Sequence, residues 1–152
     1  MLFRSMTHTV ELHRVLRSTP DRLYRAFTEP AAWAKWLPPH GYVAQVHQHE
    51  PRVGGRYAMS FIHLGSGQSH RFGGEYLALE SGRLLRYTAE FDDPALPGRM
   101  ETTVTITPVS CGVALHVVQS GIPAAIPPEG CHLGWQESLQ LLTLLVEPEI
   151  PV

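Results

Sequence analysis

The chain has 152 residues, of which 43% are hydrophobic and 17% charged, and its formal net charge is −2. This length predicts one domain over residues 1–152 that needs no disulfide or metal to fold. The charge gives no general attraction to nucleic acid, and no run approaches the ~18 apolar residues of a membrane span. Without an apolar signal-peptide core, and with only Cys111 and Cys131, we expect a soluble cytoplasmic protein with free thiols.

The first elements predicted are a strand and two short helices. Residues 8–17 alternate in polarity, which is typical of a half-buried strand. The next segment can form a helix that begins at Pro20, after a serine and a threonine able to cap it. Residues 31–37 predict a second short helix that carries Trp33 and Trp36 and stops at the following proline pair.

Six further strands are predicted over 42–49, 55–63, 70–79, 83–91, 100–109 and 112–120. Short turn-forming segments rich in glycine, proline, serine and aspartate separate them, so neighbouring strands should pair antiparallel. In the five strands from residue 55 onward, apolar side chains recur at every second position. One face of the sheet should therefore be buried and the other largely solvated.

The longest helical pattern in the chain comes last. Trp135, Leu139, Leu142 and Val146 recur at steps of four, three and four, and we expect Pro148 to end the helix. The apolar face of the sheet and this helix are most simply buried against each other. A seven-stranded sheet must twist and curl around one helix, and we expect the space between them not to be filled completely.

Five local strings in this order resemble the START-like (SRPBCC) superfamily, in the bacterial branch homologous to the activator of the heat-shock-protein-90 ATPase. They are RVLRSTPDRLYRAFTEPAAWAKWLPP, EPRVGGRY, GGEYLALESGRLLRYTAEF, SGIP and HLGWQESLQLLTLL. The resemblance covers about residues 9–147. It implies an α+β helix-grip fold: a curved antiparallel seven-stranded sheet around a long C-terminal helix, with two short helices after the first strand. It also implies a ligand cavity. Gln119 stands where many members carry histidine before the SG pair, and Glu50 where they usually have aspartate.

The side chains expected to line this cavity are large aromatic, apolar or small residues that face inward. They are Trp33, Trp36, Tyr57, Met59, Phe61, Tyr76, Tyr87, Phe91, Val104, Leu115, Val117, Gln119, Gly134, Trp135 and Ser138. Interiors rich in tyrosine and tryptophan carry polar groups that need partners, as small-molecule sites do. No catalytic residue, metal ligand or cofactor is assigned.

Two features of the pattern leave alternatives open. Gly130, Gly134 and Ser138 form a stripe of small residues on the last helix, which either admits close backbone packing or leaves room for a ligand. Five polar side chains could point into the cavity or out of it, with a solvated position at the rim favoured for each. These are Arg14, Gln45, Glu75, His116 and Gln119.

Motifs for metal or nucleophilic chemistry are weak. His47 and His49 should place two imidazoles on one strand face, but a third ligand at ordered spacing is missing, so surface histidines are the favoured interpretation. The chain has no HExxH, CxxC, nucleophile-elbow, P-loop or dinucleotide motif.

Three classes of function remain. The leading one is a binding module whose cavity holds a lipid, an aromatic compound or a polyketide-like molecule. The second is a cyclase- or hydrolase-like enzyme, which would need His116, Glu75, Arg14 or a tyrosine hydroxyl in the cavity as acid or base. The third is a co-chaperone-like interaction domain, for which a single domain of this length leaves room only for the part that resembles the family. A chaperone partner is disfavoured, and a homodimer through a sheet edge or the helical cap is a hypothesis.

Overall fold

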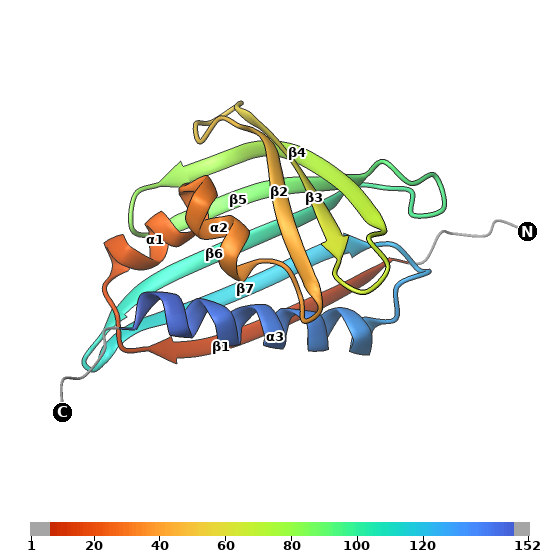
Figure 1. Ribbon diagram of the computed structural model, residues 1–152. Coiled ribbons are helices and arrows are strands. Elements are labelled where there is room, and N and C mark those ends of the chain that lie inside the picture. The colour runs from red at the N-terminus through yellow and green to blue at the C-terminus, as the bar shows by residue number, and fades with distance from the viewer. Residues whose placement is uncertain (1–6, 148–152) are drawn as a thin grey trace, which may run out of the picture.

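The computed structural model describes residues 7–147, so the expected helix end at Pro148 lies outside the described residues. These residues form seven strands and three helices, whose arrangement can be followed in Figure 1. In chain order they are β1 (His8–Leu16), α1 (Pro20–Thr28), α2 (Pro30–Trp36), β2 (Tyr42–His49), β3 (Arg56–His63), β4 (Ser69–Glu80), β5 (Leu84–Phe91), β6 (Met100–Val109), β7 (Gly112–Ile122) and α3 (Pro128–Val146). The predicted α+β fold class is confirmed, and each predicted strand boundary lies within two residues of the observed one.

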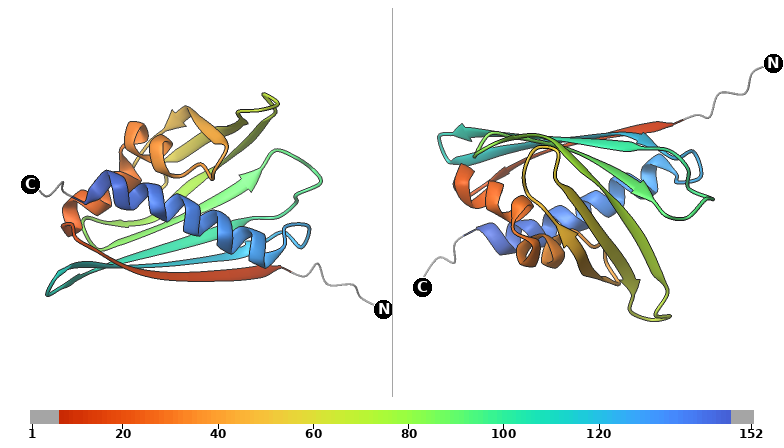
Figure 2. Two further views of the ribbon diagram at one scale, coloured as in Figure 1. Left: turned by 60° about the horizontal axis from the view of Figure 1, so that its bottom comes forward. Right: turned by 90° about the horizontal axis from the view of Figure 1, so that it is seen from above.

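The strands form one antiparallel sheet in the order β1-β7-β6-β5-β4-β3-β2. Seen from above, the sheet curls, and α3 lies along its concave side while α1 and α2 cover one end (Figure 2). Strands β1 and β2 are consecutive in sequence but lie at opposite edges of the sheet, because α1 and α2 carry the chain from one edge to the other. This arrangement puts the sheet's apolar face and α3 against each other.

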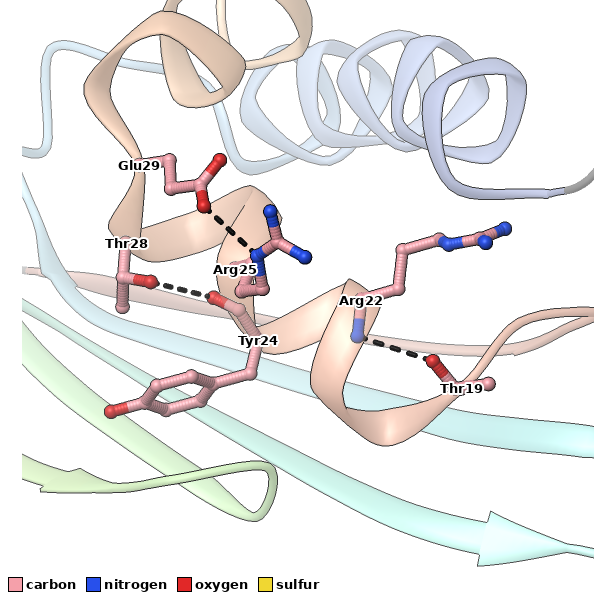
Figure 3. A network of polar contacts seen from close by, with 6 residues as sticks. All are labelled: Thr19, Arg22, Tyr24, Arg25, Thr28 and Glu29. Carbon is pink, nitrogen blue, oxygen red and sulfur yellow. Dashed lines mark hydrogen bonds and ion pairs between the residues drawn. The ribbon is translucent and has the colours of Figure 1, made fainter.

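Helix α1 begins where its sequence predicts. The Thr19 hydroxyl accepts a hydrogen bond from the Arg22 amide at 3.2 Å, and Pro20 occupies the first helical position (Figure 3). An ion pair of 2.9 Å links Arg25 to Glu29 at the end of the helix, but both side chains are more than half exposed. Pairs of this kind contribute little to stability. The cap and the proline are therefore what fix the start of α1.

Trp36 ties the two short helices together. Its indole Nε1 donates to the Ala26 carbonyl at 2.8 Å, and its ring meets the Phe27 ring edge-on with centroids 4.7 Å apart. The side chain is completely buried. Trp36 therefore serves the α1–α2 packing, and it is not among the residues that line the cavity described below.

A β-bulge in β2 separates two histidines that alternation had placed on one face. The pairing with β3 shifts register between Val46 and Gln48. As a result His49 faces inward and bonds the Tyr76 hydroxyl at 2.8 Å, whereas His47 faces outward and bonds the Ser60 hydroxyl at 2.7 Å. A bulge adds one residue to a strand and so turns the following side chains over. The two imidazoles cannot chelate one metal ion.

Gly74 in β4 allows the strands beside it to approach closely. It pairs with Tyr57 of β3, whose hydroxyl donates to the Thr88 carbonyl of β5 at 2.5 Å. A Cβ atom at Gly74 would collide with that same carbonyl oxygen. Thr88 also accepts a bond from the Glu75 amide through its hydroxyl at 3.0 Å. The missing side chain at Gly74 thus permits the β4–β5 contact that anchors the Tyr57 ring in the core.

Candidate functional site

A cavity of about 270 Å³ lies between the first half of α3 and the concave face of the sheet. Its floor comes from β3, β4, β5 and the ends of β6 and β7 that meet there, and α2 with the segment after it closes one side. The wall is predominantly apolar and includes no Asp, Glu, Lys, Arg or His side chain among the described residues. Small-molecule sites in proteins have this character: apolar walls with a few placed polar groups.

Nine of the predicted residues lie in the cavity wall. They are Trp33, Tyr57, Phe61, Tyr87, Phe91, Gln119, Gly134, Trp135 and Ser138. They come from α2, β3, β5, β7 and α3, so elements far apart in sequence meet at one site.

The other six predicted residues are buried but do not belong to the cavity wall. They are Trp36, Met59, Tyr76, Val104, Leu115 and Val117. Tyr76 points its hydroxyl at His49, and the three aliphatic residues belong to the hydrophobic core cluster. Alternation correctly places the five strand residues among these on the inner face of the sheet, but it does not tell which inward positions reach the cavity: Met59 lies between the wall residues Tyr57 and Phe61 and is itself not part of the wall.

Eight wall residues were not predicted. They are Leu37, Pro39, Phe72, Ala89, Met100, Ile122, Ile126 and Cys131. Gly130, for which the sequence left close packing and room for a ligand as alternatives, also lies in the wall. Ala89 and Phe72 follow the same inward alternation as their predicted neighbours Tyr87 and Phe91, so the pattern could have found them. Pro39 and Ile126 lie in connecting segments, where no periodicity assigns a side chain to a face.

The small-residue stripe on α3 leaves room rather than admitting close packing. A Cβ atom at Gly134 would meet no heavy atom within 4 Å, and one at Gly130 would meet only Pro127 at 4.0 Å. Ser138, the third member, is buried and donates its hydroxyl to the Leu37 carbonyl at 2.7 Å. The two glycines therefore widen the cavity, and Ser138 holds α3 to the end of α2.

Gln119 is the main polar group in the wall, and α3 holds its carboxamide in place. Its Oε1 accepts from the Trp135 indole Nε1 at 2.9 Å and from the Cys131 thiol at 3.6 Å. Its Nε2 donates to the Thr102 hydroxyl of β6 at 3.3 Å. An indole nitrogen can only donate, so the atom facing it must be the amide oxygen, and the orientation of the carboxamide is settled by chemistry.

Trp33 forms the back wall within a cluster of aromatic rings. It is fully buried and meets Tyr57 and Tyr87 edge-on, with centroids 4.9 and 5.5 Å apart. The His49 ring closes the cluster at 5.9 Å. Among the described residues, Trp33 Nε1 is the one buried side-chain polar atom without a hydrogen-bond partner. Aromatic faces are weak acceptors, so this N–H lies in surroundings that compensate little for its burial.

The ionisable groups at the site stay neutral near pH 7. Burial raises the pKa of Tyr57 well above its usual value and also raises the pKa of Tyr87, an increase that the nearby Thr102 hydroxyl partly offsets. Burial raises the pKa of the Cys131 thiol and lowers the pKa of His49, which lies just behind the wall. In each case the uncharged form is the one that burial favours.

The charged residues considered as catalytic groups lie elsewhere. His116 bonds the Glu11 carboxylate at 2.6 Å on the outer face of the sheet. The Glu75 carboxylate pairs with Arg99 at 3.9 Å, and Arg14 bonds the Thr143 hydroxyl of α3 at 3.4 Å. Gln45, the remaining polar candidate, is exposed on β2. Of the five, Gln119 alone reaches the cavity.

Within residues 7–147, no three His, Cys, Asp or Glu side chains lie close enough to hold a metal ion. None of the three helices there combines the length and hydropathy that a membrane crossing requires.

The comparisons with known proteins agree with this geometry. Residues 17–147 match the family described as activator of Hsp90 ATPase homolog 1-like protein. The crystal structure of protein CV1439 from Chromobacterium violaceum is 58% identical, covers 93% of this chain and 98% of its own, and superposes with a TM-score of 0.91. Protein MLL2253 from Mesorhizobium loti is 30% identical over 91% of this chain and 96% of its own, with a TM-score of 0.72.

A more distant structure shares the fold. The AHSA1 protein SPO3351 from Silicibacter pomeroyi is 18% identical, covers 90% of this chain and 96% of its own, and has a TM-score of 0.77. A search of curated proteins found no match. With the family model spanning most of its length, and with the curved sheet, the two short helices and the closing helix in place, the chain belongs to the activator of Hsp90 ATPase homolog 1-like family of START-like proteins.

Proposed function

We propose that the protein binds a small apolar or amphipathic molecule, such as a lipid, an aromatic compound or a polyketide-like compound, in the cavity beneath α3. The observation that carries this proposal is the uncharged, predominantly apolar wall around about 270 Å³ of free space. The pocket is partly open, so without a ligand its apolar wall is exposed to water, which is unfavourable. An apolar ligand that fills it would remove this surface from water.

The composition of α3 supports the same function. Gly134 lies in the interior of the helix, where glycine costs about 1 kcal/mol relative to alanine. A methyl group would meet nothing within 4 Å there, so packing alone does not require glycine. A site that must accommodate a guest gives a reason for the smallest residue at this position.

The enzyme alternative has weaker support. A cyclase or hydrolase needs an acid or base within hydrogen-bonding reach of its substrate. His116, Glu75 and Arg14 lie outside the cavity wall, and the hydroxyl of Tyr57, which does lie in it, already donates to the Thr88 carbonyl. The contacts of these residues support binding over catalysis.

The function can be tested by a melting-temperature screen over lipids, aromatic polyketides and hydrophobic metabolites. A ligand at a hundred times its dissociation constant would stabilise the native state by about 2.7 kcal/mol, and the melting temperature would rise by about 5–10 °C. Gly134→Leu, which fills the cavity, should abolish the shift. Gln136→Leu places the same side chain on the exposed face of α3 and should preserve it. A library without a single stabilising compound would contradict the proposal.

The family description raises co-chaperone activity as a second candidate. The observation in its favour is the exposure of Leu141, Leu144 and Leu145 on the outer side of α3, with Leu144 71% exposed. Exposed apolar side chains in a group often mark an interaction site. The test is the ATPase rate of purified heat-shock protein 90 with and without this protein. Stimulation that is lost on Leu144→Asp would favour this candidate, and an unchanged rate would exclude it.

A further inference from the structure

We infer that the cavity selects ligands that carry a neutral hydrogen-bond acceptor, such as a ketone or ester carbonyl, and that the second Nε2 hydrogen of Gln119 donates to it. The inference rests on the proposed binding function and specifies its ligand. It follows from the orientation of one carboxamide and from the charge of the wall around it.

The orientation leaves one donor unused. Trp135 and Cys131, one helical turn apart on α3, both direct their hydrogens at Gln119 Oε1, so the amide nitrogen faces away from the helix. One of its two hydrogens goes to Thr102. No other acceptor within residues 7–147 bonds Nε2, and Gln119 is part of the cavity wall. A ligand atom can therefore meet a donor there, whereas the strong acceptor of the same side chain is already occupied.

The wall also determines the charge of the acceptor. A carboxylate or phosphate taken into the cavity would lose its hydration and meet no Lys, Arg or His side chain among the lining residues. A carbonyl oxygen loses less on leaving water, and one N–H donor is enough to replace its lost hydrogen bond. The site thus favours a neutral acceptor over an anion.

The test compares acetophenone with ethylbenzene, which have a similar shape and differ by a carbonyl group in place of a methylene group. Binding is measured by NMR titration of the full chain, and selectivity is the dissociation constant of ethylbenzene divided by that of acetophenone. Comparing selectivity between variants cancels the different hydrophobicity of the two probes. In the wild type, acetophenone should also shift the Gln119 side-chain NH₂ resonances, and ethylbenzene should leave them nearly unchanged.

Two substitutions remove the donor in different ways. Gln119→Met deletes both polar atoms, and Gln119→Glu keeps an acceptor for Trp135 while replacing the N–H donor with oxygen. Selectivity for acetophenone should fall about threefold to tenfold in each, the effect of one lost hydrogen bond. Gln119→Glu provides the result if Gln119→Met fails to fold. The matched control is Gln45→Met, the same change at an exposed position of β2, which should leave selectivity unchanged.

Two results would overturn the inference, and a third would count against the binding function. Equal selectivity in the wild type and both Gln119 variants would overturn the inference and leave the binding function standing. Benzoate serves as an anion of similar size, since the amino end of α3 could attract negative charge. Tighter binding of benzoate than of acetophenone would likewise overturn the inference. Failure of both neutral probes to bind the wild type would count against the binding function itself.

Discussion

The Trp135 indole N–H donates to the Gln119 side-chain oxygen at 2.9 Å and so joins the closing helix to strand β7 at the wall of the cavity. The two residues are 16 positions apart in sequence and belong to different layers of the fold. Their bond fixes both the position of the indole and the direction of the amide. The polar part of the cavity is thus built by the packing of α3 on the sheet.

Gly134→Ala should stabilise the free protein by about 0.5–1 kcal/mol. The added methyl group meets no atom within 4 Å, and alanine loses less conformational freedom than glycine when a helix forms. The same methyl group takes space from the cavity, so the affinity for the largest ligands found in a screen should fall. Urea denaturation measures the first effect and calorimetric titration the second. A destabilised Gly134→Ala variant would show that the helix packs more closely here than the structure has it.

Gly74→Ala should have the opposite effect and destabilise the protein by about 3 kcal/mol or more. Its Cβ atom would collide with the Thr88 carbonyl oxygen, which belongs to the backbone and cannot move without disturbing the β4–β5 pairing. Denaturation in urea, with Gly134→Ala as the parallel glycine substitution, provides the comparison. Equal stabilities of the two variants would contradict the close approach at Gly74.

Stability should decrease steeply in alkali. Burial raises the pKa values of Tyr57, Tyr76 and Tyr87 above about 10, the usual value that they regain on unfolding. Below pH 10 both states hold the phenol protons and the full stability is present. As the pH rises above 10, the unfolded state loses protons that the native state retains, and the free energy of unfolding falls by about 1.4 kcal/mol per pH unit for each tyrosine. Urea denaturation across this range, with ultraviolet absorbance of phenolate, measures it; early ionisation in the native state would contradict the prediction.

Trp36→Phe and Trp135→Phe should separate folding from binding. The first removes the bond to the Ala26 carbonyl and leaves a buried gap, at a cost of about 2–3 kcal/mol, while the affinity for acetophenone stays the same. The second removes a donor from Gln119 Oε1 and alters the cavity wall, so affinity or selectivity should change. Denaturation and NMR titration of both variants test this. A change of affinity in Trp36→Phe would mean that Trp36 acts on the site after all.

The order and extent of the secondary structure could be predicted because simple alternation governs a meander of short strands. Val104, Leu115 and Val117 show the limit of that signal. They share their inward direction with Tyr87 and Gln119, yet they lie in a filled part of the core. Which part of the space between α3 and the sheet stays hollow depends on how α3 lies across the sheet. No local sequence pattern contains that information.

A backbone irregularity explains why the expected placement of His47 and His49 on one strand face is wrong. His47 and His49 are two positions apart, which in an undisturbed strand would place them on one face. The bulge between Val46 and Gln48 reverses this, and the histidines end up with Ser60 and Tyr76 on opposite sides of the sheet. By contrast, the glycine at 134 could be identified as unusual from its helical context, although only the structure decides between room and close packing.

Glutamine at position 119 has a consequence for how a bound ligand would be released. A carboxamide takes up no proton across the acidity range of living cells, and the tyrosines and Cys131 around it remain uncharged in the same range. Acidification therefore changes the charge of no side chain in the cavity wall, and the nearest imidazole, His49, lies behind the wall and bonds the Tyr76 hydroxyl. Release of a ligand would then depend on displacement, on dilution or on a partner that pulls α3 from the sheet, and not on a change of charge in the wall.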